Sequence, residues 1–287
     1  MTIETVAVLG AGTMGHGIAQ VCAAADCEVR LFDVDEDAVA AGVGRIRGNL
    51  DKGMARGKVT EDQRDAVLSR LRTTTDIRDA VTGADLVIEA APESMALKES
   101  IFREVDEAAP EGAILASNTS SLSIARIAAV LRRPERFVGM HFFNPVHIMA
   151  LVEVVWGPET SDETRASAVA FARRLRKEPI VVKDAPGFAS SRLGIVLGME
   201  AIRMVEQGVA SPEDIDKAME LGYRHPMGPL KLTDLVGLDV RLGIAEYLHE
   251  TLGSEAFAPP ELLRSMVAEG KLGKKSGQGF YDWREGS

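Results

Sequence analysis

Short apolar runs alternate with helically spaced apolar positions over residues 1–185. The first run, Thr5–Leu9 (TVAVL), is apolar and partly β-branched, which is typical of a strand buried on both faces. We expect further strands at 27–32, 85–90, 113–116, 137–140, 151–155 and, with a less apolar sequence, 179–182. Helical patterns separate several of them, for example at 97–107 and 162–176. This alternation predicts an α/β fold with a doubly wound, mainly parallel sheet.

The strand pattern stops at Pro186, and helical spacing continues to the end of the chain. The segment Ser211-Pro212-Glu213-Asp214 has the composition of a helix start, with an N-cap serine, a proline at the first helical position and acids in the first turn. We therefore expect two domains, 1–185 and 186–287, the second of them all helical. Within the first domain, a helical arm is expected near 37–72.

A glycine-rich turn follows the first strand directly. The hexapeptide GAGTMG is a G-x-G-x-x-G sequence that opens a helix-like segment, and a second buried strand follows. Gly10 permits a tight turn, Gly12 lets backbone amides approach a diphosphate, and Gly15 lets the helix pack closely on the sheet. Thr13 and Met14 complete the turn, whose backbone amides attract phosphate together with the helix N-terminus. In this strand–turn–helix–strand setting, the motif predicts a Rossmann-type dinucleotide site.

The second strand leads into Asp33, 18 residues beyond the last glycine of the turn. A carboxylate here accepts hydrogen bonds from a ribose 2′-hydroxyl, and its charge repels a 2′-phosphate. Asp35 and Glu36 add negative charge just beyond it. These acids favour NAD over NADP as the cofactor.

The composition is that of an ordinary globular protein with an acidic balance. The 287 residues include 33 Lys+Arg and 43 Asp+Glu, a formal net charge of −10. Such a balance argues against a general nucleic-acid binder, which presents a broad basic face. The sequence shows no signal peptide and no charge-free apolar run of membrane-spanning length. With only Cys22 and Cys27, we expect a cytoplasmic protein with reduced thiols.

One stretch of the arm is locally basic. A single acid, Asp51, stands there against five bases, which are Arg45, Arg47, Lys52, Arg56 and Lys58. A basic helical face in an acidic protein is suited to binding phosphates. It is equally typical of a helix face that is simply solvated, and the residues alone leave both interpretations open.

His141 and Glu153 carry the candidate acid–base chemistry. His141 lies at the end of one predicted strand, and Glu153 interrupts the apolar run LVEVV twelve residues later. A carboxylate in an apolar strand is costly unless it is paired, and a histidine is a suitable partner. Polar residues at the strand ends of a doubly wound sheet also face its ligand crevice. The pair predicts a general base in which Glu153 orients the imidazole and stabilises its charged form.

Several motifs occur in a fixed order along nearly all of the chain: GAGTMG, SNTSSL, HFFNPV, LVEVV, DAPGF, HPMGPL and GKKSGQGFYDW. In this order and spacing they resemble the 3-hydroxyacyl-CoA dehydrogenase family, and most closely its short bacterial members, the 3-hydroxybutyryl-CoA dehydrogenases. The resemblance implies an NAD-binding domain, a helical C-terminal domain that forms a homodimer, and an active site in the cleft between the domains. It also implies that the basic arm contacts the CoA part of an acyl-CoA substrate.

The resemblance also implies roles for individual residues. His141 matches the family's base and Glu153 its partner, and Ser120, which follows SNT, lies near both substrate and nicotinamide. Four residues match positions near NAD, namely Glu93, Lys98, Asn144 and Lys275. On the arm, the CoA contacts are expected from Asn49, Lys52 and Arg56.

Two positions depart from the family pattern. The family usually reads D-x-P-G-F-x-x-N-R, whereas this chain has Ser191 in place of the asparagine that helps to bind the substrate oxygen. A serine has a shorter side chain with one donor, and losing an oriented donor at a developing charge costs about two to three decades in rate. Ala150 replaces the lysine that usually follows HFFNPV-x-x-M. These departures bear on turnover or substrate choice, and not on the fold.

We therefore expect an NAD-dependent enzyme that transfers a hydride between NAD and C3 of a short-chain L-3-hydroxyacyl-CoA, with His141, Glu153, Ser120 and Ser191 as its catalytic residues. Two alternatives stay open. One is a related dehydrogenase that acts on a 3-hydroxy sugar acid or a carrier-protein thioester. The other is a non-catalytic NAD-binding homologue whose active site has decayed through Ser191.

Overall fold

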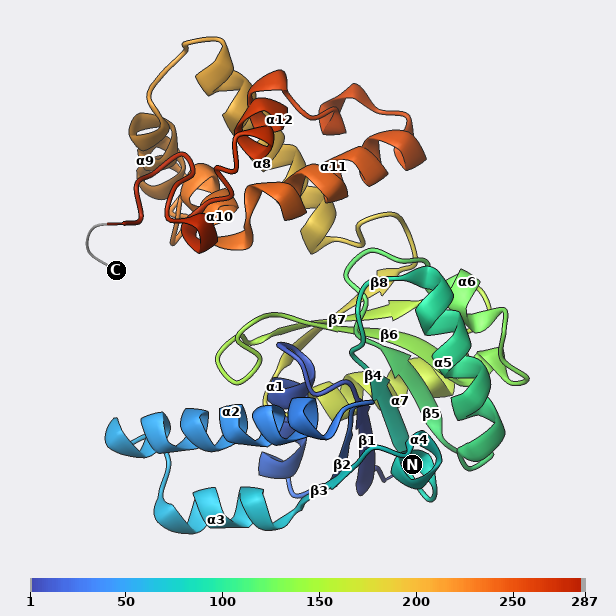
Figure 1. Cartoon of the computed structure of the whole chain (residues 1–287). Coiled ribbons are helices and arrows are strands. Elements are labelled where there is room, and N and C mark those ends of the chain that lie inside the picture. The colour runs from blue at the N-terminus through green and yellow to red at the C-terminus, as the bar shows by residue number, and fades with distance from the viewer. Residues whose placement is uncertain (1, 285–287) are drawn as a thin grey trace. The chain divides into compact units, whose positions relative to one another are not determined.

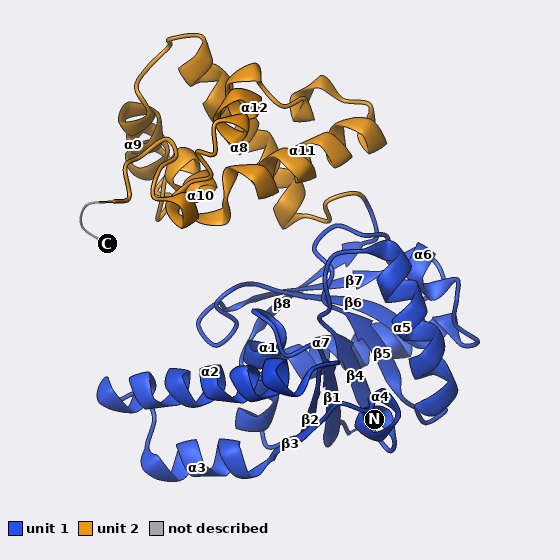
Figure 2. Ribbon diagram, viewed as in Figure 1, with its two compact units in different colours: residues 1–185 blue, residues 186–287 orange. Residues whose placement is uncertain are grey.

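The computed structural model describes residues 2–284 and divides the chain into two compact units, Met1–Ala185 and Pro186–Ser287. Figure 2 colours the two units separately. The division falls at the proline where the strand pattern of the sequence stops. No helix within residues 2–284 is long and apolar enough to cross a membrane.

The first unit is built on an eight-stranded sheet with helices on its faces (Figure 1). The strand order is β3-β2-β1-β4-β5-β6-β7-β8, and all neighbours run parallel except β6 and β7. The strands are β1 (Thr5–Leu9), β2 (Glu28–Phe32), β3 (Leu71–Thr74), β4 (Leu86–Glu89), β5 (Ile114–Ser117), β6 (Phe137–Phe142), β7 (Leu151–Trp156) and β8 (Glu178–Lys183). The predicted doubly wound, mainly parallel sheet is confirmed. Its order reverses between β1 and β4, which is where such sheets bind ligands.

Helices bury both faces of this sheet, as its continuous apolar strands require. They are α1 (Gly15–Ala24), α2 (Glu36–Ala55), α3 (Glu61–Ser69), α4 (Ile77–Val81), α5 (Met95–Ala108), α6 (Ile124–Ala128), the 3-10 helix η1 (Pro134–Arg136) and α7 (Asp162–Arg174). Ile18 of α1 and Phe171 of α7 belong to one buried cluster with strand residues such as Val8. Phe102 of α5 packs edge-on against Phe137 of β6, with ring centroids 4.8 Å apart.

The helical arm ends earlier than the sequence pattern suggested. Helices α2 and α3 form it, and the next residues, Leu71–Thr74, form the edge strand β3 beside β2. The expected arm therefore overlaps the start of a strand that the sequence analysis missed. The segment LRTT carries an arginine and two threonines and is only partly buried, because an edge strand has one neighbour. The less apolar run at 179–182 lies in β8, at the other edge of the sheet.

The second unit is helical. Its elements are α8 (Ser190–Glu206), α9 (Pro212–Gly222), α10 (Pro229–Val236), α11 (Leu238–Leu252), η2 (Glu255–Phe257), α12 (Glu261–Ala268) and η3 (Lys274–Ser276). Met199 of α8 and Leu248 of α11 belong to its buried core. The expected helix start is confirmed, because Ser211 Oγ accepts a hydrogen bond from the Asp214 amide at 3.2 Å.

Candidate active site

The glycine turn leads from β1 into α1, and each glycine meets a different steric demand. Gly10 has a φ of +105°, and a Cβ added to it would lie 2.8 Å from the carbonyl oxygen of Ala90. A Cβ on Gly15 would overlap the carbonyl oxygen of Gly10. In contrast, nothing lies within 4 Å of a Cβ on Gly12. The turn therefore combines a close backbone crossing with open space over Gly12, as a dinucleotide diphosphate requires.

The N-terminus of α1 is also suited to binding a phosphate. Met14, its N-cap residue, makes no side-chain capping bond, and the first turn carries no acid. Amides at a helix N-terminus carry partial positive charge and bind phosphate oxygens. Arg45 of α2 donates from Nη2 to the carbonyl oxygen of Ala11 at 2.9 Å. This base of the arm therefore supports the turn rather than reaching out to solvent phosphate.

Asp33 lies directly after β2 and beside the glycine turn. Its Oδ2 accepts a hydrogen bond from the Ala11 amide at 2.8 Å, and its Oδ1 accepts one from the Val34 amide at 2.8 Å. These bonds hold the carboxylate in place. Because each carboxylate oxygen has a further lone pair, Asp33 keeps the capacity to accept from ribose hydroxyls. The geometry fits the role that the sequence predicts for it.

The antiparallel pairing of β6 with β7 brings His141 and Glu153 face to face. The two residues are direct partners in the register of these strands, and His141 Nδ1 lies 2.7 Å from Glu153 Oε2. The glutamate is fully buried, and the histidine is 8% exposed. A buried carboxylate at this distance orients the imidazole and stabilises its protonated form. The structure thus brings together the pair that the sequence spacing predicts.

Ser120 follows β5 in a loop that is held at both ends. Glu93 Oε1 accepts hydrogen bonds from the Ser120 amide at 2.9 Å and from its hydroxyl at 3.2 Å. Asn118 lies in the same loop, and its Oδ1 accepts a hydrogen bond at 2.8 Å from the amide of Phe142 in the neighbouring strand β6. This bond ties the loop to the end of β6, which carries His141. Glu93, expected near NAD, is therefore engaged in fixing the serine loop.

A buried ion pair that the sequence analysis missed adjoins this loop. Glu89, at the end of β4, accepts hydrogen bonds from the Lys98 ammonium at 2.6 Å and from the Ser117 hydroxyl at 2.6 Å. Lys98 is 1% exposed, and its Nζ also lies 3.5 Å from Glu93 Oε2. Lys98, expected to contact NAD, thus holds two carboxylates in position. The sequence gives one signal for this ion pair, because Glu89 interrupts the apolar run DLVIEA and a buried charge needs a partner. The run does not show which residue that partner is.

The residues of the arm that are expected to contact CoA differ in their surroundings. Lys52 and Arg56 are exposed on and just after α2, and no carboxylate within residues 2–284 pairs with them. Asn49 turns toward α1, where its Nδ2 donates to a glutamine side chain at 3.1 Å. Asp51, the single acid of the basic stretch 45–58, accepts a hydrogen bond from Arg64 of α3 at 2.7 Å. The two bases therefore present positive charge that their neighbours do not neutralise, whereas Asn49 is engaged within the unit.

The remaining candidate residues belong to other elements of the chain. Ser191 is in the first turn of α8, and Asn144 is exposed after β6. Lys275 of η3 has its Nζ 2.6 Å from Asp239 Oδ1. At Ala150, the carbonyl oxygen accepts a hydrogen bond from the Glu178 amide at 2.8 Å. Position 150 therefore helps to join β7 and β8 through its backbone, whichever side chain it carries.

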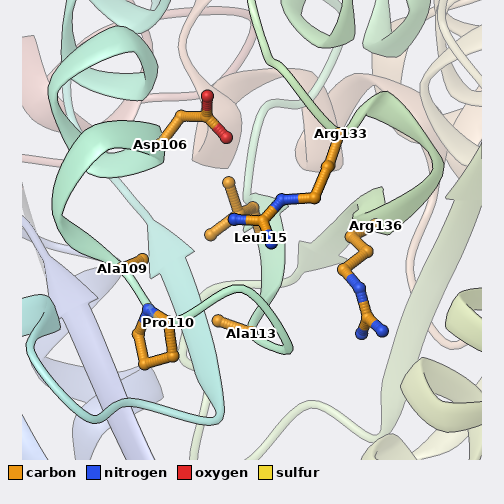
Figure 3. A pocket seen from close by; sticks show the side chains of 7 residues that line it. All are labelled: Asp106, Ala109, Pro110, Ala113, Leu115, Arg133 and Arg136. Carbon is orange, nitrogen blue, oxygen red and sulfur yellow. The ribbon is translucent and has the colours of Figure 1, made fainter.

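A small hollow near the amino ends of β5 and β6 takes no part in this arrangement. Figure 3 shows its lining residues, which are Asp106, Ala109, Pro110, Ala113, Leu115, Arg133 and Arg136. Its volume is about 10 Å³. That is room for about one water molecule, so the hollow is too small for a nucleotide.

Comparison with known proteins extends over both units. Residues 5–185 match the description "3-hydroxyacyl-CoA dehydrogenase, NAD binding domain", and residues 187–283 match "3-hydroxyacyl-CoA dehydrogenase, C-terminal domain". The chain belongs to the 3-hydroxyacyl-CoA dehydrogenase family. Among similar dehydrogenases, the probable 3-hydroxybutyryl-CoA dehydrogenase of Bacillus subtilis is 48% identical over 99% of each chain. The 3-hydroxybutyryl-CoA dehydrogenase of Mycobacterium tuberculosis is 45% identical over 98% of this chain and 99% of its own.

A solved structure supports the same assignment. The (S)-3-hydroxybutyryl-CoA dehydrogenase of Ralstonia eutropha superposes with a TM-score of 0.95 at 44% identity, covering 98% of this chain and 99% of its own. The family resemblance of the motifs, NAD as cofactor, and NAD-dependent oxidation of a 3-hydroxyacyl-CoA are therefore confirmed. The alternatives of a dehydrogenase for a 3-hydroxy sugar acid or a carrier-protein thioester, and of a non-catalytic homologue, are set aside.

Proposed function

We propose that this dehydrogenase interconverts a short-chain L-3-hydroxyacyl-CoA and the corresponding 3-ketoacyl-CoA, with His141 as the general base. The observation that carries the proposal is the 2.7 Å contact between His141 Nδ1 and the buried carboxylate of Glu153. Strands β1 and β6 run in the same direction in the sheet. The glycine turn after β1 and the base near the end of β6 therefore share the carboxyl edge of the sheet, where such folds bind their ligands.

The protonation step follows from which ring nitrogen the carboxylate engages. Because Nδ1 of His141 faces Glu153, Nε2 is the atom that takes the proton of the substrate hydroxyl in oxidation and returns it in reduction. The imidazolium that forms is stabilised by the adjacent carboxylate of Glu153. NAD+, when bound, accepts the hydride that leaves C3.

Other residues of this chain position the substrate. The Ser120 hydroxyl and, on the helical unit, Ser191 are the groups that we assign to the substrate oxygen. Glu93 fixes the Ser120 loop before substrate arrives, so that orienting this donor costs little at each turnover. The exposed cations Lys52 and Arg56 are suited to the phosphates of CoA.

The preference for short acyl chains is proposed from the relatives. Those from Bacillus subtilis, Mycobacterium tuberculosis and Ralstonia eutropha all carry the name 3-hydroxybutyryl-CoA dehydrogenase. Their identities of 44–48% extend over nearly the whole chain, including both units. Similarity of that extent supports a substrate of the same class.

Reduction of acetoacetyl-CoA by NADH, followed as the loss of NADH absorbance, tests this function. The wild-type protein should consume NADH only when the thioester is present. Ser191→Asn should raise kcat by about tenfold or more, because the amide supplies a longer side chain with a second polar group for the substrate oxygen. Ser190→Asn, the same change at the neighbouring position, should not. Tight NADH binding without turnover on any acyl-CoA would refute the assignment.

We also propose that the helical unit forms a homodimer. Several of its large apolar side chains are exposed, namely Leu193 on α8, Leu232, Leu235 and Val236 on α10, and Val240 on α11. Leu193 is 67% exposed, whereas Leu238 on α11 is fully buried in the unit's own core. Exposed apolar patches commonly mark interaction sites. Sedimentation velocity should therefore give twice the chain mass of 30.8 kDa, and a monomeric mass would contradict the dimer.

The state of the two cysteines is relevant to the cell compartment of the protein. Cys22 and Cys27 are both buried free thiols. Burial raises the pKa of the Cys22 thiol well above its usual range, so this side chain stays protonated. We place the protein in the cytoplasm, whose reducing conditions keep such thiols free, and cell fractionation checks this placement.

A further inference from the structure

Glu89, the last residue of β4, is a fully buried carboxylate that lies out of reach of substrate and cofactor. Its Oε1 accepts hydrogen bonds from the Lys98 ammonium and from the Ala91 amide, each at 2.6 Å. Its Oε2 accepts one from the Ser117 hydroxyl at 2.6 Å. A buried ion pair contributes little more stability than a well-packed apolar pair of similar volume. Its presence at this strand end therefore points to a role in placing other groups.

The serine loop, residues 117–123, is held by carboxylates at its start and in its middle. The Ser117 hydroxyl, which donates to the buried carboxylate, also accepts a hydrogen bond from the Thr119 amide at 3.3 Å. Further along, Glu93 Oε1 accepts hydrogen bonds from the Thr119 hydroxyl at 2.6 Å and from the Ser120 amide at 2.9 Å. The position of the Ser120 hydroxyl therefore depends on where the Glu93 carboxylate lies.

Lys98 of α5 connects the two carboxylates. Its Nζ lies 2.6 Å from Glu89 Oε1 and 3.5 Å from Glu93 Oε2. Within residues 2–284 it is the one cation that pairs with either of them. Because Glu89 is the closer partner of the ammonium, Oε1 of Glu93 stays available to the serine loop.

The charge of Glu89 thus affects Ser120 indirectly. An ammonium that is removed from water needs a carboxylate beside it. If Glu89 were neutral, Lys98 would have Glu93 as its one carboxylate and would draw it closer. The serine loop would then lose the acceptor that holds it.

We propose that Glu89 is a positioning residue of this dehydrogenase, which acts through Lys98 to hold the Ser120 hydroxyl for the oxygen on C3 of the substrate. The inference rests on the proposed function, in which Ser120 is assigned to that oxygen. A donor that is oriented before the substrate arrives stabilises the charge that develops in the transition state. Loss of the orientation therefore lowers kcat, whereas the cofactor affinity is kept.

Glu89→Gln tests this role, because it keeps the size of the side chain and removes its charge. The kcat for acetoacetyl-CoA reduction should fall by about tenfold or more, and the dissociation constant of NADH should stay within about threefold of the wild-type value. Asp106→Asn is the matched control. Asp106 is a buried acid of the same helix as Lys98, and it accepts a hydrogen bond from Arg132 at 2.7 Å. Its variant should lower the melting temperature but leave kcat unchanged.

A double-mutant cycle separates positioning from a general loss of packing. Ser120→Ala removes the hydroxyl that Glu89 is proposed to hold. Adding Glu89→Gln to Ser120→Ala should therefore lower kcat by less than about threefold, because the two residues act through one interaction. A merely structural role would lower kcat by the same factor in both backgrounds, and that result would overturn the proposal.

The remaining outcomes separate this proposal from the proposed function. Wild-type turnover of acetoacetyl-CoA with an unchanged kcat in Glu89→Gln would overturn the positioning role alone. A weaker affinity for NADH in that variant, with kcat unchanged, would assign the ion pair to the cofactor instead. Should Glu89→Gln fold poorly, Ser117→Ala removes the other bond between Glu89 and the loop and should give the same cycle with Ser120→Ala. No wild-type turnover on any acyl-CoA would overturn the function itself.

Discussion

His141→Gln should lower kcat for acetoacetyl-CoA reduction by about 1,000-fold, within the range that a general acid or base contributes. Glutamine has a similar reach and its amide can still donate to Glu153, but it neither takes nor returns a proton at neutral pH. The dissociation constant of NADH should stay within about threefold of the wild-type value, because the variant removes a transition-state interaction rather than a cofactor contact. NADH absorbance gives the rate, and NADH fluorescence gives the affinity.

A matched change at another histidine controls for the substitution itself. His249 lies on α11, with Nδ1 bonded to the carbonyl oxygen of Ser254 at 3.1 Å, and His249→Gln should leave kcat unchanged. Glu153→Gln removes the charge that stabilises the imidazolium while keeping the base, so its kcat should fall as well. Near-normal turnover by His141→Gln would exclude the imidazole as the proton-transfer group.

Gly15→Ala should weaken NADH binding by about 100-fold or more, which corresponds to roughly 2.7 kcal/mol. The added methyl group would overlap the carbonyl oxygen of Gly10, and Gly10 is itself confined against Ala90. The turn and the start of α1 must then move apart, which displaces the amides that bind the diphosphate. Fluorescence titration measures the loss of affinity, and thermal unfolding measures the accompanying loss of stability.

Two further alanine variants separate packing from cofactor binding. Gly12 has open space around its Cβ position, so Gly12→Ala should keep the melting temperature but still weaken NADH binding, because the methyl group occupies space meant for the ligand. Gly112 lies before β5 and also has open space at its Cβ position, so Gly112→Ala should change neither quantity. Unchanged affinity in Gly15→Ala would show that the cofactor does not use this turn.

The pairing of His141 with Glu153 was predictable because both residues break an apolar pattern. Each lies in or beside a run of buried residues where an isolated polar group is costly. The glycine turn and Asp33 were predictable for a similar reason, since strand, turn and helix followed one another within a short segment. The edge strand β3 was not, because LRTT lacks the apolar run by which the other strands were found.

The partners of individual polar residues were less accessible to sequence reasoning. Nothing in the spacing says that Lys98 turns toward Glu89, or that Asn49 bonds to α1, because those contacts depend on how helices rotate on the sheet. Arg241 shows the limit most clearly. Its segment reads as an ordinary helix, and only the three-dimensional packing shows that its Nε is buried without an acceptor among residues 2–284.

The antiparallel strand pair also has a consequence for how this enzyme can evolve. Both members of the proton-transfer pair lie on β6 and β7 of the first unit, whereas Ser191, which we assign to the substrate oxygen, lies on α8 of the second. We therefore expect substitutions in the helical unit to change the fit of the substrate without disturbing the pairing of the base. A chimera that receives residues 186–287 from a relative should inherit the relative's acyl preference while keeping its own catalytic histidine.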